Sequence, residues 1–190
     1  MQDTMLYLCK SIQGCVLGYT QSDEITLLLQ DWYKLNTCAW FDNEVQKICS
    51  VSASMATLSF NKAFQDNDID KKYENKYNRA LFDSRCFNTP FEEVTNNFIW
   101  RQQDAVRNSI LSLGQSLFSF KEMQGVKCNK LQDKMLTEKD INWNNLPTTK
   151  KRGSCAIKVD GVWTIDNEIP IFTKDREYIE KLLRVEEENV

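Results

Sequence analysis

Residues 15–29 read CVLGYTQSDEITLLL, and this stretch decides the fold. Two short apolar runs, residues 15–19 and 25–29, enclose a polar centre at residues 20–24. Apolar runs of this length on both sides of a polar turn are typical of a β-hairpin. We therefore predict two paired strands whose tip carries the polar side chains.

Periodic apolar residues elsewhere predict several helices and a second hairpin. Spacings of three and four, the period of an amphipathic helix, occur over residues 1–12, 44–65, 89–120, 129–139 and 174–185. Strand patterns occur over residues 80–87, 154–159 and 162–165, the last two joined by Asp160-Gly161, a favoured two-residue turn. Because helices and strands mix without a regular βαβ alternation, we predict an α+β fold.

Two of these helices have a predicted inward face. The helix over residues 89–120 begins at TPFE, in which Thr89 is the expected N-cap. Its core stripe is expected to hold Ile99, Val106, Ile110, Leu113, Leu117 and Phe120. The helix over residues 44–65 is expected to face inward with Val45, Ile48, Cys49, Met55, Ala56, Ala63 and Phe64. Residues 66–78, which join the helix over residues 44–65 to the strand over residues 80–87, are expected to form a charged loop.

The composition of the 190 residues excludes several kinds of chemistry. Histidine is absent, so this chain cannot form a Ser-His-Asp triad, a Cys-His pair or a His-ligated zinc site. No run of about 18 apolar residues could span a membrane, and the N-terminal pattern is not that of a signal peptide. The seven cysteines include no C-x-x-C pair, so we expect reduced, mostly buried thiols in the cytoplasm.

Charge is distributed unevenly along the chain, whose net charge is −3. Residues 121–158 contain nine Lys or Arg and four Asp or Glu, so this region carries +5 and the remainder −8. A local excess of positive charge predicts an anionic partner for one region, in contrast to a uniformly basic nucleic-acid-binding protein. A lysine-rich helix that faces solvent would explain the same pattern without a partner.

Carboxylates at the tip of the first hairpin are the first candidates for chemistry. Successive side chains of an extended chain point to opposite faces, so Asp23 and Glu24 cannot both enter one core. Mg²⁺ prefers oxygen ligands and usually takes one or two carboxylates together with substrate phosphates. The tip therefore suits a Mg²⁺ site, with Glu24 or Asp83 as the partner of Asp23. An ordinary polar turn is the alternative.

Polar residues on one side of the long helix are candidates for binding phosphate. Arg101, Asp104 and Asn108 follow one another at spacings of three and four, and Arg107 lies close by. An arginine can bind a phosphate through two parallel hydrogen bonds while a neighbouring Asp or Asn orients it. The alternative is an ion pair between Arg101 and Asp104 on a solvated helix face.

A basic loop is expected at residues 148–153, which read TTKKRG. Its cations, Lys150, Lys151 and Arg152, suit the phosphates of a nucleotide or of an RNA backbone. Upstream, residues 142–145 read NWNN and offer amides that can bond to base edges and an indole that can stack. An exposed tryptophan here would favour RNA, whereas a buried one would indicate a core residue.

Taken together, these motifs resemble one family. In order, the chain carries YTQSDE (19–24), FDSR (82–85), WRQQD (100–104), INWNN (141–145) and KRG (151–153). This set resembles the tRNA(His) guanylyltransferase family, the polymerases that extend the 5′ end of a tRNA in the 3′-to-5′ direction. The resemblance covers about residues 1–160 and is specific as a set.

The resemblance implies a ferredoxin-like polymerase palm that holds two Mg²⁺ ions, extended by the long helix and a basic C-terminal α/β region. Residues 1–88 would form part of the palm and residues 89–190 the C-terminal region. Asp23 and Glu24 match the acids of the family's Ser-Asp-Glu motif, which makes them the implied metal-binding and catalytic residues. The implied reaction activates a tRNA 5′-monophosphate with ATP or GTP, after which the 3′-hydroxyl of a nucleotide attacks.

The other expected site residues bind the nucleotide and the tRNA. We assign nucleotide binding to Ser22 and Lys150. We assign tRNA binding to Arg101, Arg107, Asn108, Lys151 and Arg152. The resemblance also implies a homotetramer. Because the sequence has neither a membrane-spanning run nor a signal-peptide pattern, we expect a cytoplasmic location and no membrane partner.

Two departures from the family pattern are visible. Residues 106–112 read VRNSILS where enzymes that add G to tRNA(His) carry HINNLYN. The chain is therefore nearer the bacterial-like members, which resemble 5′-end repair enzymes. The family also has an upstream strand with an Asp-Gly motif that supplies another metal ligand, and the one Asp-Gly of this sequence is Asp160-Gly161. We therefore expect a family member without its first strand.

This expectation leaves two alternatives to an active nucleotidyltransferase. One is a protein with the same scaffold that binds tRNA or nucleotides without catalysing transfer. The other is a nucleotide cyclase, whose palm is similar, although the basic loop and the long helix argue against it.

Overall fold

The computed structural model describes residues 1–32, 37–67 and 71–183. Its helices are α1 (Gln2–Ser11), α2 (Val45–Asp66), α3 (Val94–Leu117), α4 (Phe120–Met123), α5 (Cys128–Lys139), α6 (Thr148–Arg152) and α7 (Glu177–Glu180). Its strands are β1 (Cys15–Gln21), β2 (Glu24–Leu29), β3 (Ser154–Val159) and β4 (Val162–Asp166). Short 3₁₀ turns are η1 (Trp40–Asn43), η2 (Lys71–Lys76), η3 (Phe91–Glu93), η4 (Trp143–Asn145) and η5 (Lys181–Leu183).

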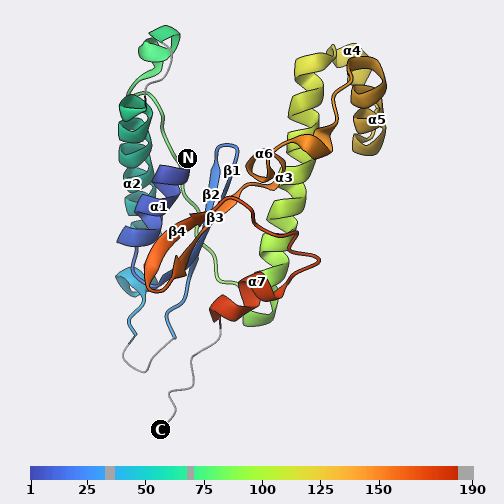
Figure 1. Ribbon diagram of the computed structural model, residues 1–190. Coiled ribbons are helices and arrows are strands. Elements are labelled where there is room, and N and C mark those ends of the chain that lie inside the picture. The colour runs from blue at the N-terminus through green and yellow to red at the C-terminus, as the bar shows by residue number, and fades with distance from the viewer. Residues whose placement is uncertain (33–36, 68–70, 184–190) are drawn as a thin grey trace.

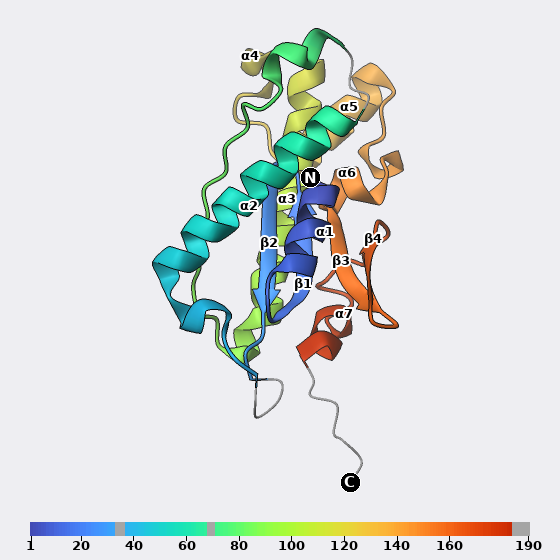
Figure 2. The ribbon, with the colours of Figure 1, turned by 90° about the vertical axis from the view of Figure 1, so that its left-hand side faces the viewer.

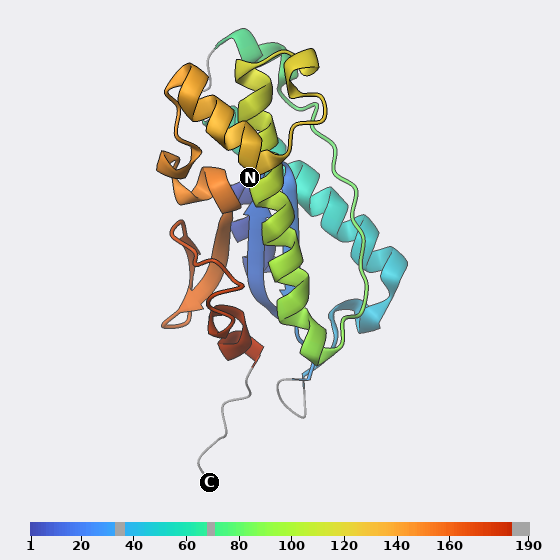
Figure 3. The ribbon, with the colours of Figure 1, turned by 90° about the vertical axis from the view of Figure 1, so that its right-hand side faces the viewer.

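The described elements form three layers, and the middle layer is a single sheet (Figure 1). The strands pair antiparallel in the order β2-β1-β3-β4. α1 and α2 cover one face of the sheet (Figure 2), and α3 crosses the other face (Figure 3). This arrangement confirms the α+β class. No helix in the described ranges is long and apolar enough to cross a membrane.

The core consists of three apolar clusters. The first joins the sheet to α3 and α7 and contains Leu17, Tyr19, Val94, Phe98, Cys155, Ile169, Phe172, Tyr178, Ile179 and Leu183. The second lies under α1 and includes Met5, Leu8 and Ile12. The third joins the later part of α3 to α5 through Ile110, Phe118, Leu131 and Met135. The first cluster draws on residues from both sides of position 88, and the two-domain division proposed above stays a prediction.

α1 packs closely on β1 because Gly18 has no side chain. A β-carbon at this position would lie 2.5 Å from the Cys9 sulfur and 2.8 Å from Met5 Cγ. Glycine in a strand often marks such a close approach of another element. The helix predicted over residues 1–12 is thereby confirmed as α1, with its apolar side against the sheet.

The predicted strand over residues 80–87 is wrong as a sheet strand, although the segment is extended. Its side chains alternate between exposed and half-buried positions, which is the period of a strand. In the described part of the chain it pairs with none of the four strands. Instead, Ala80 exchanges hydrogen bonds of 2.9 and 3.1 Å with the Asn61 amide, and Phe82 N–H donates to Thr57 Oγ1 at 3.1 Å. Side chains of α2 therefore replace a neighbouring strand as partners of its backbone.

Only some of the residues that were predicted to face inward on the two long helices are buried. Within α2, all of which the structure describes, Ala56 alone is buried, and Val45 is 56% exposed. In the long helix Ile110 is buried, whereas Phe120 is 84% exposed. The helix ends at Leu117 and breaks before α4, so the 3.6-residue period no longer sets the direction of Phe120.

Three further predictions need correction. Thr89 is not an N-cap: η3 precedes α3, with Pro90 at the capping position and no side-chain cap there. The basic loop at residues 148–153 is a short helix, α6. The last helix begins at Glu177, later than predicted, and continues as η5 from Lys181; residues 184–185 lie outside the described residues. The charged segment 66–78 contains η2, and residues 68–70 lie outside the described ranges.

The cysteines are less buried than expected. All seven lie in the described part of the chain, and none of them forms a disulfide. Cys9, Cys15 and Cys155 are buried, Cys38 is exposed, and Cys49, Cys86 and Cys128 are half-buried.

Candidate functional site

The tip of the first hairpin presents a free carboxylate. Gln21 pairs with Glu24, so Ser22 and Asp23 alone form the turn, and Ser22 has a left-handed backbone with φ of 48°. Both turn residues are exposed. Among the described residues, the Asp23 carboxylate has no hydrogen bond or ion pair. Asp23 is therefore available to a ligand without loss of a contact within the protein.

Glu24, in contrast, is held by neighbours on both sides. Gln21 Nε2 donates to Glu24 Oε2 at 3.1 Å, and Arg101 Nη1 lies 3.5 Å from the same oxygen. Thr20 Oγ1 donates to the Glu24 carbonyl at 2.8 Å and fixes the backbone behind it. The two acids that were predicted as a pair thus have different surroundings: one is free and the other is oriented.

Arg101 connects α3 to the hairpin. Its guanidinium lies 5.1 Å from the Trp100 ring, and its Nε is buried without a partner among the described residues. The predicted alternative, an ion pair between Arg101 and Asp104, is not formed in this part of the chain. Asp104 accepts a hydrogen bond from Asn108 Nδ2 at 3.0 Å instead. Arg101 therefore belongs to the hairpin tip, while Asn108 and the exposed Arg107 lie further along α3.

The start of β3 lies directly against β1. Tyr19 Oη donates to the Arg152 carbonyl at 2.7 Å. A β-carbon on Gly153 would lie 2.3 Å from the Thr20 carbonyl oxygen, and Gly153 has a φ of 85°. Figure 1 shows the resulting arrangement, in which the hairpin tip, α6 and the middle of α3 meet at one end of the sheet.

The three cations of α6 have different roles. Lys151 Nζ donates to the Asn144 carbonyl at 2.6 Å, and Arg152 Nε donates to the Ile169 carbonyl at 3.0 Å. Lys150 is exposed, and its ammonium has no hydrogen bond or ion pair within the described ranges. Of the three, Lys150 is therefore the side chain that can approach an anion without giving up a structural bond.

Trp143 is half-buried and packs mainly against the core. Its Nε1 donates to Ser109 Oγ at 3.0 Å, and its ring contacts the cluster between α3 and α5. Ser109 Oγ in turn donates to the Lys150 carbonyl at 2.6 Å. The indole thus links α3 to α6, and it does not present the exposed face that would favour stacking on RNA.

Tyr19 is a buried phenol beside the tip. Its pKa is raised above the usual value of 10, first by burial and then by the nearby Cys155, Glu24 and Asp104. The raised pKa keeps the hydroxyl neutral, so it acts as a hydrogen-bond donor that fixes α6. Sequence reasoning missed this residue and Gln21. A two-residue turn at Ser22 and Asp23 would have identified Gln21, because it places Gln21 opposite Glu24. The partner of Tyr19 lies 133 residues away in the sequence, so no local signal could have found it.

Neither candidate partner of Asp23 completes a metal cage. Asp83 forms an ion pair of 3.2 Å with Arg85 on the exposed side of segment 80–87. Across the described ranges, no three Cys, Asp or Glu side chains gather closely enough to hold a metal ion. The Asp23 carboxylate at the tip is an oxygen donor of the kind that Mg²⁺ prefers, and such a site usually takes its remaining ligands from water and substrate phosphates.

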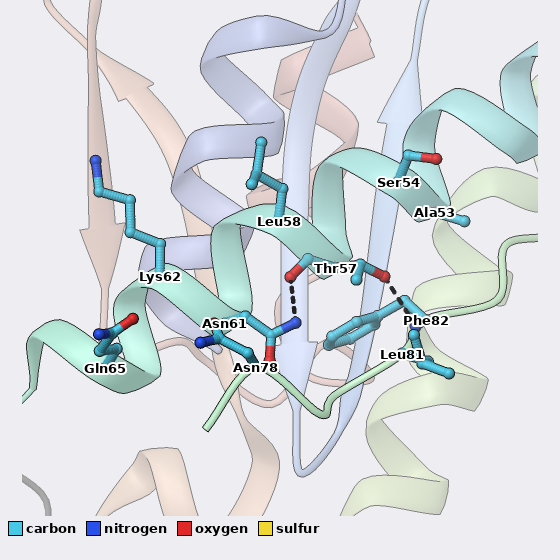
Figure 4. Close-up of a pocket in the computed structure, with 10 residues that line it drawn as sticks. All are labelled: Ala53, Ser54, Thr57, Leu58, Asn61, Lys62, Gln65, Asn78, Leu81 and Phe82. Carbon is cyan, nitrogen blue, oxygen red and sulfur yellow. Dashed lines mark hydrogen bonds between the residues drawn. The ribbon is translucent and has the colours of Figure 1, made fainter. Parts of the chain in front are cut away.

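A groove of about 690 Å³ lies elsewhere, between α2 and the start of segment 80–87. Figure 4 shows its lining, which includes Leu58, Asn61, Lys62, Leu81 and Phe82. None of the hairpin-tip residues described above lines it, and its walls are mainly apolar. The groove is therefore separate from the candidate site.

Comparison with known proteins identifies the family. The family model described as Thg1, tRNAHis guanylyltransferase, matches residues 1–90. The solved structure of a bacterial tRNA(His) guanylyltransferase (Thg1)-like protein in complex with ATP is 48% identical, with a TM-score of 0.88 over 95% of this chain and 76% of that one. This chain belongs to the tRNA(His) guanylyltransferase family. The match also agrees with the predicted closeness to bacterial-like members.

More distant members of the guanylyltransferase family are similar over most of the chain. A bacterial Thg1-like protein in complex with GTP has a TM-score of 0.75 at 40% identity, over 95% of this chain and 74% of that one. A probable tRNA(His) guanylyltransferase from Dictyostelium discoideum is 27% identical over 83% of this chain. The chain spans 63% of the length of this Dictyostelium relative.

Proposed function

We propose that this chain provides the nucleotide-binding and tRNA-binding site of a Mg²⁺-dependent nucleotidyltransferase. The reaction would add a nucleotide to the 5′ end of a tRNA, in the 3′-to-5′ direction. The observation that carries the proposal is the free carboxylate of Asp23 at the hairpin tip, in a chain that is similar over 95% of its length to bacterial relatives in complex with ATP or GTP. We retain the cytoplasm as the proposed location, because tRNA is the proposed substrate.

Each residue at the tip has a distinct proposed role. Asp23 would hold Mg²⁺ together with the phosphates of ATP or GTP, and the Ser22 hydroxyl would bond to a phosphate oxygen. When bound, the metal supplies positive charge to the phosphoryl oxygens. Glu24, oriented by Gln21 and Arg101, would keep negative charge at the metal side of the tip.

Cations on α3 and α6 would bind the tRNA backbone. Arg107 and Lys150 are exposed, and Arg101 lies at the tip. Lys151 and Arg152, which already bond to backbone carbonyls, would act mainly by shaping α6. This proposal changes two earlier assignments: Lys150, which was expected to bind the nucleotide, is free to contact the tRNA backbone, whereas Lys151 and Arg152, which were expected to bind tRNA, hold the helix.

A second function, binding without transfer, is favoured by one observation. The described residues bring no third carboxylate to Asp23 and Glu24, whereas phosphoryl transfer with two metal ions uses several. If no further ligand joins them, the chain would bind a nucleotide and tRNA without catalysing addition. The homotetramer expected from the family stays a prediction in either case.

The experiment compares two aspartates at hairpin turns, Asp23→Asn and Asp160→Asn. Both residues are exposed, so neither substitution should unfold the protein. GTP binding is measured by calorimetry with and without Mg²⁺. We expect Asp23→Asn to weaken Mg²⁺-dependent binding at least about tenfold, or 1.4 kcal/mol, and Asp160→Asn to bind like the wild type. Equal binding by both variants would reject the assignment of Asp23.

A transfer assay distinguishes the two functions. Labelled GTP is incubated with Mg²⁺, ATP and a tRNA that carries a 5′-monophosphate. Incorporation of label that is lost in Asp23→Asn supports the transferase. Mg²⁺-dependent binding without incorporation supports the binding function.

A further inference from the structure

Segment 80–87 follows α2 in a regular register. Asn61 bonds to Ala80, Thr57 bonds to Phe82 as Figure 4 shows, and Ser52 Oγ donates to Ser84 Oγ at 2.7 Å. As the segment advances by two residues, its partner on α2 moves back by about one helical turn. The even-numbered side chains of the segment therefore face the helix, and the odd-numbered ones face solvent.

One further step in this register brings a cysteine of α2 opposite a cysteine of the segment. From residue 61 to residue 49 the helix rises about 18 Å, while residues 80 to 86 of an extended chain cover about 20 Å. The two elements thus stay in step, and Cys86 comes to lie opposite Cys49. The two thiols are near enough for Cys49 to raise the pKa of Cys86.

Both thiols are accessible to small molecules. Cys49 and Cys86 are half-buried, in contrast to Cys9, Cys15 and Cys155 in the core. Partial burial and the neighbouring Cys49 thiol raise the pKa of Cys86. Since the thiolate is the reactive form, oxidation of the pair should accelerate as the pH rises.

We propose that Cys49 and Cys86 form a redox-sensitive site that a peroxide converts into a disulfide. One thiolate of the pair attacks one oxygen of hydrogen peroxide, the O–O bond breaks, and hydroxide leaves to give a sulfenic acid. The thiolate of the other cysteine then attacks this sulfur, the S–S bond forms, and a second hydroxide leaves. With the two thiol protons, the products are one disulfide and two waters. The two thiols lose two electrons, and the peroxide is reduced.

The disulfide would fasten segment 80–87 to α2. This segment carries Asp83 and Arg85 on its outward side, both largely exposed. At present it is held by hydrogen bonds from α2 side chains, which include Ser52, Thr57 and Asn61. A covalent bond would therefore restrict the FDSR motif without altering the hairpin tip.

The test uses the full chain, reduced and then freed of reductant. It is treated with hydrogen peroxide at neutral and at alkaline pH, and free thiols are blocked before proteolysis. We expect non-reducing mass spectrometry to find a peptide pair joined through Cys49 and Cys86, with loss of two of the seven thiols. Yield should be higher at alkaline pH, and dithiothreitol should separate the pair.

Matched serine variants identify the pair. Cys49→Ser and Cys86→Ser should each reduce the yield of intramolecular disulfide at least roughly tenfold. Cys128→Ser, which removes another half-buried thiol, should leave the yield unchanged. Oxidation of wild-type protein that links Cys49 to a different cysteine, or that yields sulfinic acids without a link, would overturn the proposal.

Discussion

Gln102 joins α3 to the segment before α7 and provides the sharpest test of the packing around the site. Its side chain is 4% exposed. Nε2 donates to the Pro170 carbonyl at 2.9 Å, and Oε1 accepts from the Phe172 N–H at 2.9 Å. Gln102→Leu keeps a side chain of similar size but removes the partners of both backbone groups.

The expected loss follows from these two bonds. A buried donor or acceptor without a partner costs about 1–3 kcal/mol, so two groups cost about 2–6 kcal/mol. Additional apolar burial by leucine offsets about 1 kcal/mol. We therefore expect Gln102→Leu to lower the free energy of unfolding by about 1–5 kcal/mol, which is a substantial share of the roughly 5–15 kcal/mol typical of a domain.

Urea denaturation, followed by circular dichroism, measures this loss. With a slope of about 2 kcal/mol per molar urea, the midpoint should fall by roughly 0.5–2.5 M. The control is the exposed neighbour, Gln103→Leu, for which a change within about 0.5 kcal/mol is expected. If the two variants have equal midpoints, the Gln102 bonds do not hold α3 in place, and the reasoning is refuted.

Three further predictions concern the site. Gly153→Ala should lower the free energy of unfolding, measured by thermal unfolding, by at least about 2 kcal/mol. Gly161 has open space around it, so Gly161→Ala should lower this free energy by about 1 kcal/mol or less. Lys150→Ala should lower the slope of log tRNA affinity against log salt by about one, with unfolding unchanged. The pKa of Tyr19 is raised in the folded protein, so its neutral hydroxyl stabilises the fold fully below about pH 10. This stabilisation is lost as the pH rises, because the tyrosine ionises first in the unfolded chain. Tyr19→Phe should flatten this alkaline decline.

The sequence determined most elements of this protein, because their signals are local. The apolar runs around Ser22 and Asp23 predict the first hairpin, and Asp160-Gly161 predicts the second. The order of motifs identified the family, which the bacterial structure confirms. Asp23 was recognised as a candidate ligand from its place between two strands, and that assignment stays a prediction.

Only the tertiary structure decided how these elements combine, because the contacts join residues far apart in sequence. Segment 80–87 has the alternation of a strand, yet α2 supplies its hydrogen bonds. Arg101 pairs with Glu24 across the fold, although Asp104 is much nearer along the chain. Likewise Lys150, Lys151 and Arg152 look alike in sequence. Lys151 and Arg152 differ from Lys150 because they bond to backbone carbonyls that only packing brings within reach.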